Sequence, residues 1–167
     1  ENEDISKYLP NDVIDNLIRI DYSLFFKLLK AKIMTDDNLQ NYVDVDEGIE
    51  YRLKKYVIKA NNLDEFIKLI KTKRYTYNKI NRMFIHILVG FKKSDNLKVI
   101  DYTKILGFDK KGLNYLNKTK NSIVIPNGVN TKSNTFKYEL QASLIYDLIN
   151  STNTFLFELK SKPVIKN

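Results

Sequence analysis

The chain has 167 residues, of which 43% are hydrophobic and 29% charged, a composition typical of one globular domain. It contains no cysteine, one histidine and five glycines, which excludes a thiolate metal site, a cysteine nucleophile and a glycine-rich phosphate loop. No apolar run approaches the roughly 20 residues of a membrane span, and the first residues do not resemble a signal peptide. The chain begins without methionine, so we expect an excised part of a longer, cytoplasmic protein.

Apolar residues at helical spacing predict helices over most of the chain, namely 11–18, 22–33, 47–60, 62–70, 76–89, 94–105, 109–118 and 135–150. Asp21 and Asn62 are expected N-caps, while Gly90 and Gly107 are expected to end helices. The helix 135–150 is apolar all round, which predicts burial. The one extended segment expected lies near 122–126. The predicted fold class is therefore mainly α, a helical bundle-like single domain over residues 1–167.

The net charge of +8 is unevenly distributed along the chain. Residues 1–50 have a net charge of −7, residues 51–120 of +13 and residues 121–167 of +2. A segment as basic as 51–120 attracts polyanions. Lysine is abundant throughout, in a composition that an AT-rich genome would produce, so a solvated set of helix faces is the alternative interpretation.

The candidate RNA-binding site lies where the helix 76–89 begins. Lys71, Lys73 and Arg74 can neutralise phosphates, and backbone N–H groups at the helix start favour anions. Tyr75 and Tyr77 can stack on unpaired bases, as single-stranded RNA recognition often requires. The alternative is a connector with solvated lysines and with tyrosines packed under the helix.

Three further basic residues extend this candidate site. Lys79 and Arg82 share one face of the helix 76–89 with His86, and Arg52 flanks the apolar stripe of the helix 47–60. For His86 we favour a structural role, either on a solvated helix face or packed against a neighbouring helix.

The acidic residues Asp44, Asp46, Glu47 and Glu50 do not have the spacing of a calcium loop, so no metal site is expected. Acidic residues at the beginning of a helix explain the cluster more simply, and Asp46 or Glu47 is expected to pair with Arg52.

Several motifs resemble the C-terminal region of the bacterial tRNA(Met) cytidine acetate ligase family. They are EGIEYRLKK at 47–55, IKTKRYT at 70–76 and INRMFIHIL at 80–88, with weaker matches across most of the chain. At 141–146 this chain has QASLIY where the family carries RASDIY, so it lacks both the arginine and the aspartate.

The resemblance implies a parent enzyme that uses ATP to activate acetate as acetyl-adenylate and acetylates the wobble cytidine of elongator tRNA(Met). It implies a catalytic N-terminal domain with an H-x-G-H signature, which this chain lacks because His86 is its one histidine. We therefore expect a C-terminal fragment that has no catalytic residue and no cofactor of its own. Its expected partners are elongator tRNA(Met) and that N-terminal domain; membrane association is not expected, and the oligomeric state is left open.

Three functions remain open at this point. The first is tRNA binding through Lys71, Lys73, Arg74, Arg82 and Arg52. The second is DNA binding by a helix-turn-helix around Gly107, with lysines on the following helix. The third is a structural or dimerising module, which a buried and acid-paired Arg74 would favour.

Overall fold

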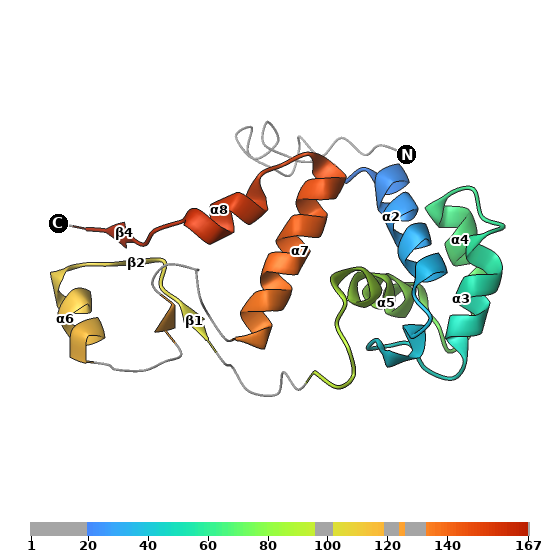
Figure 1. Cartoon of the computed structure of the whole chain (residues 1–167), viewed down its shortest axis with the longest axis horizontal. Helices are drawn as coiled ribbons and strands as arrows, with labels where there is room; N and C mark the ends of the chain where they lie inside the picture. Colours follow the sequence, from blue (N-terminus) through green and yellow to red (C-terminus); the bar gives the residue numbers. More distant parts are fainter. Residues whose placement is uncertain (1–19, 96–101, 119–123, 126–132, 167) are drawn as a thin grey trace.

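The structure is a computed structural model, and the residues that it describes are 20–95, 102–118, 124–125 and 133–166. Its elements are α2 (Tyr22–Thr35), the 3-10 helix η2 (Leu39–Asn41), α3 (Ile49–Val57), α4 (Leu63–Ile70), α5 (Tyr77–Val89), β1 (Thr103–Lys104), β2 (Gly107–Phe108), α6 (Lys110–Lys118), β3 (Val124–Ile125), α7 (Asn134–Asn150), α8 (Thr154–Lys160) and β4 (Val164–Ile165). Figure 1 shows an elongated molecule with α2 to α5 at one end, α7 in the middle, and α6, α8 and the strands at the other end.

The main core lies between α2, α3, α4 and α5. Helix α5 buries Ile80, Phe84 and Ile87 completely, which confirms the apolar stripe predicted for residues 76–89. Helix α4 places the Phe66 ring against the rings of Phe84 and Phe26, at centroid distances of 5.4 and 5.7 Å. This core fixes the face of α5 that turns inward, and so it also fixes the polar face that turns outward.

The predicted helix ends are confirmed at three positions. The Asp21 carboxylate accepts hydrogen bonds from two backbone N–H groups in the first turn of α2, and the Asn62 side chain accepts one from Glu65. Gly90 ends α5 in the left-handed conformation, with φ of 80°. Each of these groups satisfies helix-end backbone groups that would otherwise lack a partner.

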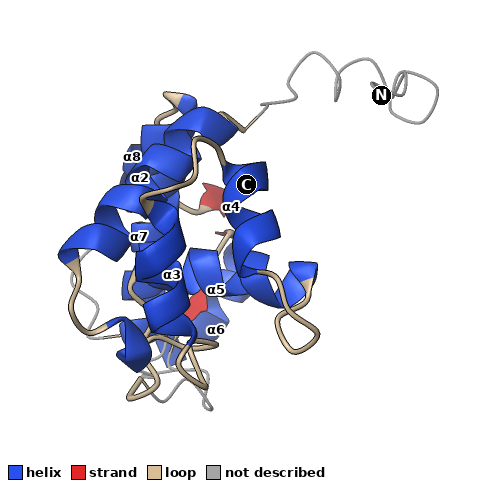
Figure 2. Ribbon diagram, turned by 90° about the vertical axis from the view of Figure 1, so that its right-hand side faces the viewer, coloured by secondary structure: helices blue, strands red, loops and turns tan. Residues whose placement is uncertain are grey.

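The expectation of a mainly α, helical bundle-like domain is wrong, because the fold is α/β. Strand β1 pairs in parallel with β3, and β2 pairs in parallel with β4. Figure 2 shows the short strands in red among the helices. Gly107 does not end a helix; it lies in β2, where a Cβ atom would meet the Val164 carbonyl oxygen at 2.9 Å. Each strand has two residues, which is too short for the alternation by which a sequence indicates a strand.

Two predicted helices also need correction. Residues 103–104, expected to lie in the helix 94–105, form β1, so the helix-turn-helix expected around Gly107 does not exist. Helix α7 forms as predicted but is not buried all round, because Leu144 and Leu148 are 43% and 55% exposed. The predicted helix 11–18 lies outside the described residues.

Candidate nucleic-acid interface

The acidic residues predicted near a helix start form a tight loop, which we call the acidic loop (residues 44–47). Asp44 and Glu47 have positive φ angles of 65° and 55°, and Gly48 follows with 78°. Residues other than glycine rarely adopt this left-handed backbone conformation, so contacts around the loop must hold the loop in place. Three of the candidate RNA ligands, Arg74, Tyr75 and Arg82, supply some of those contacts. Lys93 and His86, which were not candidates, supply others.

Arg82 is held by the acidic loop. Its Nε and Nη2 atoms donate hydrogen bonds to the two carboxylate oxygens of Asp44, at 2.8 and 3.1 Å. This guanidinium lowers the pKa of the Asp44 carboxyl, against the opposing effect of burial. His86 Nδ1 lies 3.1 Å from the same carboxylate, and its ring packs on the edge of Phe91. His86 therefore has a structural role, but it packs against loop residues rather than a neighbouring helix. Arg82 is 61% exposed but already paired.

Arg74 is paired with the acidic loop but not buried. Its Nη1 atom donates a hydrogen bond to the Glu47 carboxylate at 2.8 Å, and its side chain is 77% exposed. An exposed pair of this kind is weak because solvent screens it, so a phosphate can compete for the guanidinium. A buried and acid-paired Arg74 would have favoured the structural-module hypothesis, but Arg74 is paired and exposed, so this support is lacking.

Tyr75 cannot stack on a base, so that part of the site prediction is wrong. Its side chain is 3% exposed, and its hydroxyl donates to the Asp46 carbonyl oxygen and accepts from the Asp46 N–H. The Lys79 ammonium lies 4.2 Å from the centre of the Tyr75 ring. Tyr75 instead anchors the acidic loop beneath the start of α5, which matches the packed-tyrosine alternative.

Arg52 also has a structural position. Its Nη2 atom donates to the Leu69 carbonyl oxygen of α4 at 2.5 Å, and its guanidinium lies over the Tyr56 ring. The predicted pairing of Arg52 with Asp46 or Glu47 is wrong, since Glu47 binds Arg74 and Asp46 binds Lys93. Arg52 therefore fixes α3 against α4 rather than extending the interface.

Lys71 and Lys73 are exposed on the connector between α4 and α5, and Lys79 is half-buried on α5. Among the described residues, none of these three lysines forms an ion pair. Tyr77 is 48% exposed on another face of α5. Among the described residues at the predicted site, Lys71, Lys73 and Lys79 form no ion pair with an acid. The neighbouring Arg74 and Arg82 each pair with one.

The described residues lack two other features that would indicate a function. They contain no group of three histidine, cysteine, aspartate or glutamate side chains that could hold a metal ion. None of their helices is long and apolar enough to cross a membrane. The cytoplasmic location stays a prediction.

A family model described as HIGH Nucleotidyl Transferase matches residues 1–159, so the chain belongs to this family. Similar relatives are the tRNA(Met) cytidine acetate ligases of Anoxybacillus flavithermus, 32% identical over 146 residues, and Bacillus subtilis, 35% identical over 136 residues. The matches cover 78% and 74% of this chain. They cover 36% and 32% of the relatives, so the chain spans about a third of the length of these curated proteins.

Solved structures of Thermotoga maritima TmcAL share the fold. The form bound with alpha-thio ATP has a TM-score of 0.67 at 18% identity, over 94% of this chain and 46% of that one. The apo form has a TM-score of 0.62 at 19% identity, over 83% of this chain and 39% of that one.

The family match corrects the resemblance as we first interpreted it. Because the nucleotidyl transferase model covers nearly the whole chain, the expectation of a C-terminal region that lacks this unit is wrong. The expectations that the chain is not catalytic and has a separate N-terminal domain as partner are unsupported. The match does not depend on a two-histidine signature, since His86 is the one histidine in the sequence.

The expectation that this chain takes no cofactor is unsupported too, because a related structure was solved bound with alpha-thio ATP. A groove of about 620 Å³ between α2, α4 and α5 is lined by one lysine, Lys27, and by no glycine. A triphosphate needs several cations or a backbone cradle, so this groove does not fit ATP.

Proposed function

We propose that the chain is part of a tRNA-modifying ligase that joins acetate to a cytidine of elongator tRNA(Met) with ATP. Within it, we propose that the basic connector (residues 71–74), together with Lys79 and Arg82, holds the RNA backbone. The observation that carries the proposal is that Lys71, Lys73 and Lys79 form no ion pair among the described residues, although the neighbouring Arg74 and Arg82 are both paired with acids. Lysines left unpaired in this way remain available to neutralise phosphates.

The acidic loop adds an electrostatic reason for the arrangement. Asp44 holds the Arg82 guanidinium by two hydrogen bonds, and Glu47 holds Arg74 of the connector by one, at 2.8 Å. The Arg82 fork is therefore oriented for bidentate contact when a phosphate replaces the carboxylate.

Replacing Lys71, Lys73 and Lys79 together by glutamine is expected to weaken tRNA binding about tenfold at 100 mM salt, because three phosphate contacts disappear. Fluorescence anisotropy with labelled elongator tRNA(Met) measures the change in Kd.

The matched control replaces Lys110, Lys111 and Lys118 of α6, which are also exposed lysines removed in the same number. This control triple is expected to change Kd by less than about threefold. If replacing the three α6 lysines weakens binding and replacing Lys71, Lys73 and Lys79 does not, the proposal is contradicted and the nucleic-acid surface lies on α6.

A further inference from the structure

The groove between α2, α4 and α5 has the composition of a site for a flat, neutral ring. Its floor is apolar and includes Phe26 and Ile67, which are 4% and 2% exposed. Two tyrosines stand at its rim: Tyr22 at the start of α2 is 62% exposed, and Tyr77 at the start of α5 is 48% exposed. Exposed aromatic rings around an apolar floor offer stacking surface that water covers poorly.

Three asparagine side chains add hydrogen-bonding groups to this groove. Among the described residues, the Asn61 side-chain nitrogen donates to Glu65 and the Asn62 side-chain oxygen caps α4, while the other polar side-chain atom of each makes no hydrogen bond. Asn81 has no hydrogen-bond partner among the described residues. The residues that line the groove therefore include side-chain amides that can donate and accept, which is the combination that recognises the edge of a base.

The charges of the lining residues indicate which ligand fits. Lys27 and Asp64 are the charged residues among those that line the groove, and they are of opposite sign. A nucleoside triphosphate would meet no net positive charge there, whereas a neutral base needs none. The volume of about 620 Å³ is within the usual range for small-molecule sites and exceeds the size of one base.

The position of the groove connects it to the basic connector. Helix α5 begins at Tyr77, three residues after Arg74, and Tyr77 lines the groove. The connector therefore ends close to the edge of the groove. A strand whose phosphates lie on the connector can turn one unstacked base into the groove, as proteins that bind single-stranded RNA do.

We propose that this groove binds one unpaired nucleobase of the RNA, stacked against Tyr77 and Tyr22 and contacted at its edge by Asn81. The assignment rests on the proposed RNA function and deepens it by adding a base-binding site that the basic residues do not form. The ligand class is a neutral pyrimidine or purine base presented by a single-stranded loop.

The test uses the whole chain and nucleosides, which carry no phosphate and so do not depend on the basic connector. Nuclear magnetic resonance titrations with cytidine and adenosine follow the side-chain amide signals of Asn61, Asn62 and Asn81. We expect saturable shifts of these signals with a millimolar Kd, and about tenfold weaker binding in Tyr77→Ala. Tyr77→Phe, which keeps the ring, is expected to bind within about twofold of the wild type.

The matched control is Tyr51→Ala, because Tyr51 is 77% exposed on α3 and does not line the groove. It is expected to leave nucleoside binding unchanged. The proposal is overturned if nucleosides leave the asparagine signals unshifted, or if Tyr51→Ala weakens binding as much as Tyr77→Ala. It is also overturned if ATP shifts these signals with more than tenfold higher affinity than adenosine, since the groove would then recognise a triphosphate. Loss of nucleoside binding with intact, salt-dependent tRNA binding would reject the base site while leaving the proposed function standing.

Discussion

Replacing Phe66 by alanine is expected to lower the free energy of unfolding by about 3–5 kcal/mol. The Phe66 side chain is completely buried, and its ring stacks on Phe84 with an angle of 6° between the ring planes. Because Phe26 packs on it as well, at a centroid distance of 5.7 Å, the core cannot collapse around the missing ring without moving two helices. The loss combines the transfer free energy of the ring with the cost of the cavity that remains.

Urea unfolding followed by circular dichroism measures this effect, with the slope of the transition checked for change. The matched control is Phe157→Ala, since Phe157 is 68% exposed on α8 and its loss is expected to change stability by less than about 0.5 kcal/mol. A loss below about 1 kcal/mol in Phe66→Ala would contradict the packing of α2, α4 and α5 described here. If the alanine variant does not fold, Phe66→Leu is expected to show a smaller loss of the same sign.

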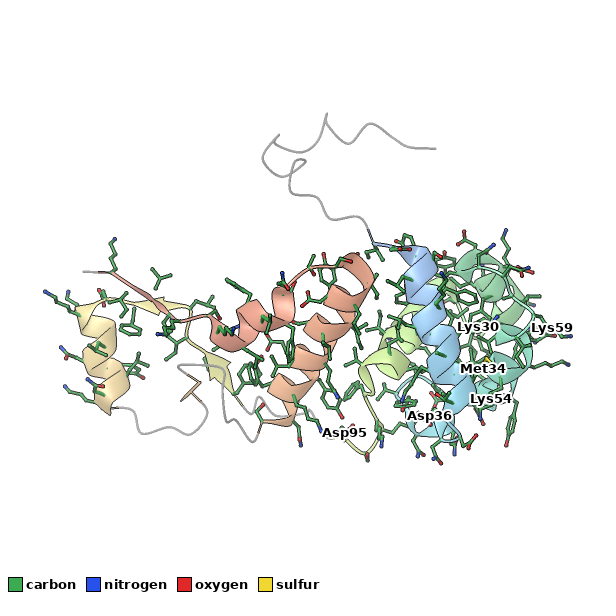
Figure 3. The ribbon with its side chains drawn as sticks, turned by 45° about the horizontal axis from the view of Figure 1, so that its top comes forward. Lys30, Met34, Asp36, Lys54, Lys59 and Asp95 are labelled. Carbon is green, nitrogen blue, oxygen red and sulfur yellow. The ribbon has the colours of Figure 1, made fainter. Side chains whose placement is uncertain are left out.

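The second large effect concerns Asp36, which follows the end of α2 (Figure 3). Burial raises the pKa of this carboxyl, but hydrogen bonds from the Tyr42 hydroxyl, the Asn38 N–H and the Lys32 ammonium outweigh burial and lower the pKa to about 2. The three donors lie 2.5, 2.9 and 3.0 Å from the carboxylate oxygens. The ionised carboxylate is therefore stabilised in the folded state relative to the unfolded chain, where the pKa is close to 3.8.

A depressed folded-state pKa gives a stabilisation that is complete above the unfolded pKa and disappears as the pH falls through the folded pKa. Asp36→Asn is accordingly expected to cost about 2 kcal/mol at pH 7 and progressively less between about pH 4 and pH 2. Urea unfolding of both proteins across this range measures the difference. Asp37→Asn is the control, because the Asp37 side chain is 91% exposed and pairs with Lys54 on the surface. A deficit in Asp36→Asn that is equal at pH 7 and pH 3 would show that the carboxylate charge is not its cause.

Helices with a strong apolar stripe were predictable from the sequence, because burial imposes a period of 3.6 residues over three or four turns. Helix α5 and the caps at Asp21, Asn62 and Gly90 follow this rule. The strands were not predictable, since two-residue parallel strands are defined by their partners rather than by a local pattern. The burial of helix α7 was not predictable either. The helix is apolar on all sides, and its neighbours cover only part of this apolar surface.

The basic residues of the candidate site were found from the sequence, but their roles were not. The negative charge of residues 1–50 and the positive charge of 51–120 were a signal that acids and bases would pair, and the pairs Arg74–Glu47 and Arg82–Asp44 realise it. Which acid binds which base depends on the left-handed turn of the acidic loop, which spacing does not reveal. The burial of Tyr75 follows from that same turn. The groove has no local signal, because its lining residues come from three separate helices.

The measurement that tests the central claim most directly is the salt dependence of tRNA binding by the whole chain. Elongator tRNA(Met), a second tRNA and a DNA duplex are titrated between 50 and 200 mM salt. Phosphate contacts from the five proposed cations, Lys71, Lys73, Arg74, Lys79 and Arg82, predict a log–log slope of about −3.5 to −4.5 for the tRNA(Met) complex. The account also predicts a shallower slope, by about 2 units, once Lys71, Lys73 and Lys79 are neutralised. Two results would contradict an RNA-binding role for the basic connector. One is that no binding is detected at 50 mM salt. The other is that the slope is unchanged when Lys71, Lys73 and Lys79 are replaced.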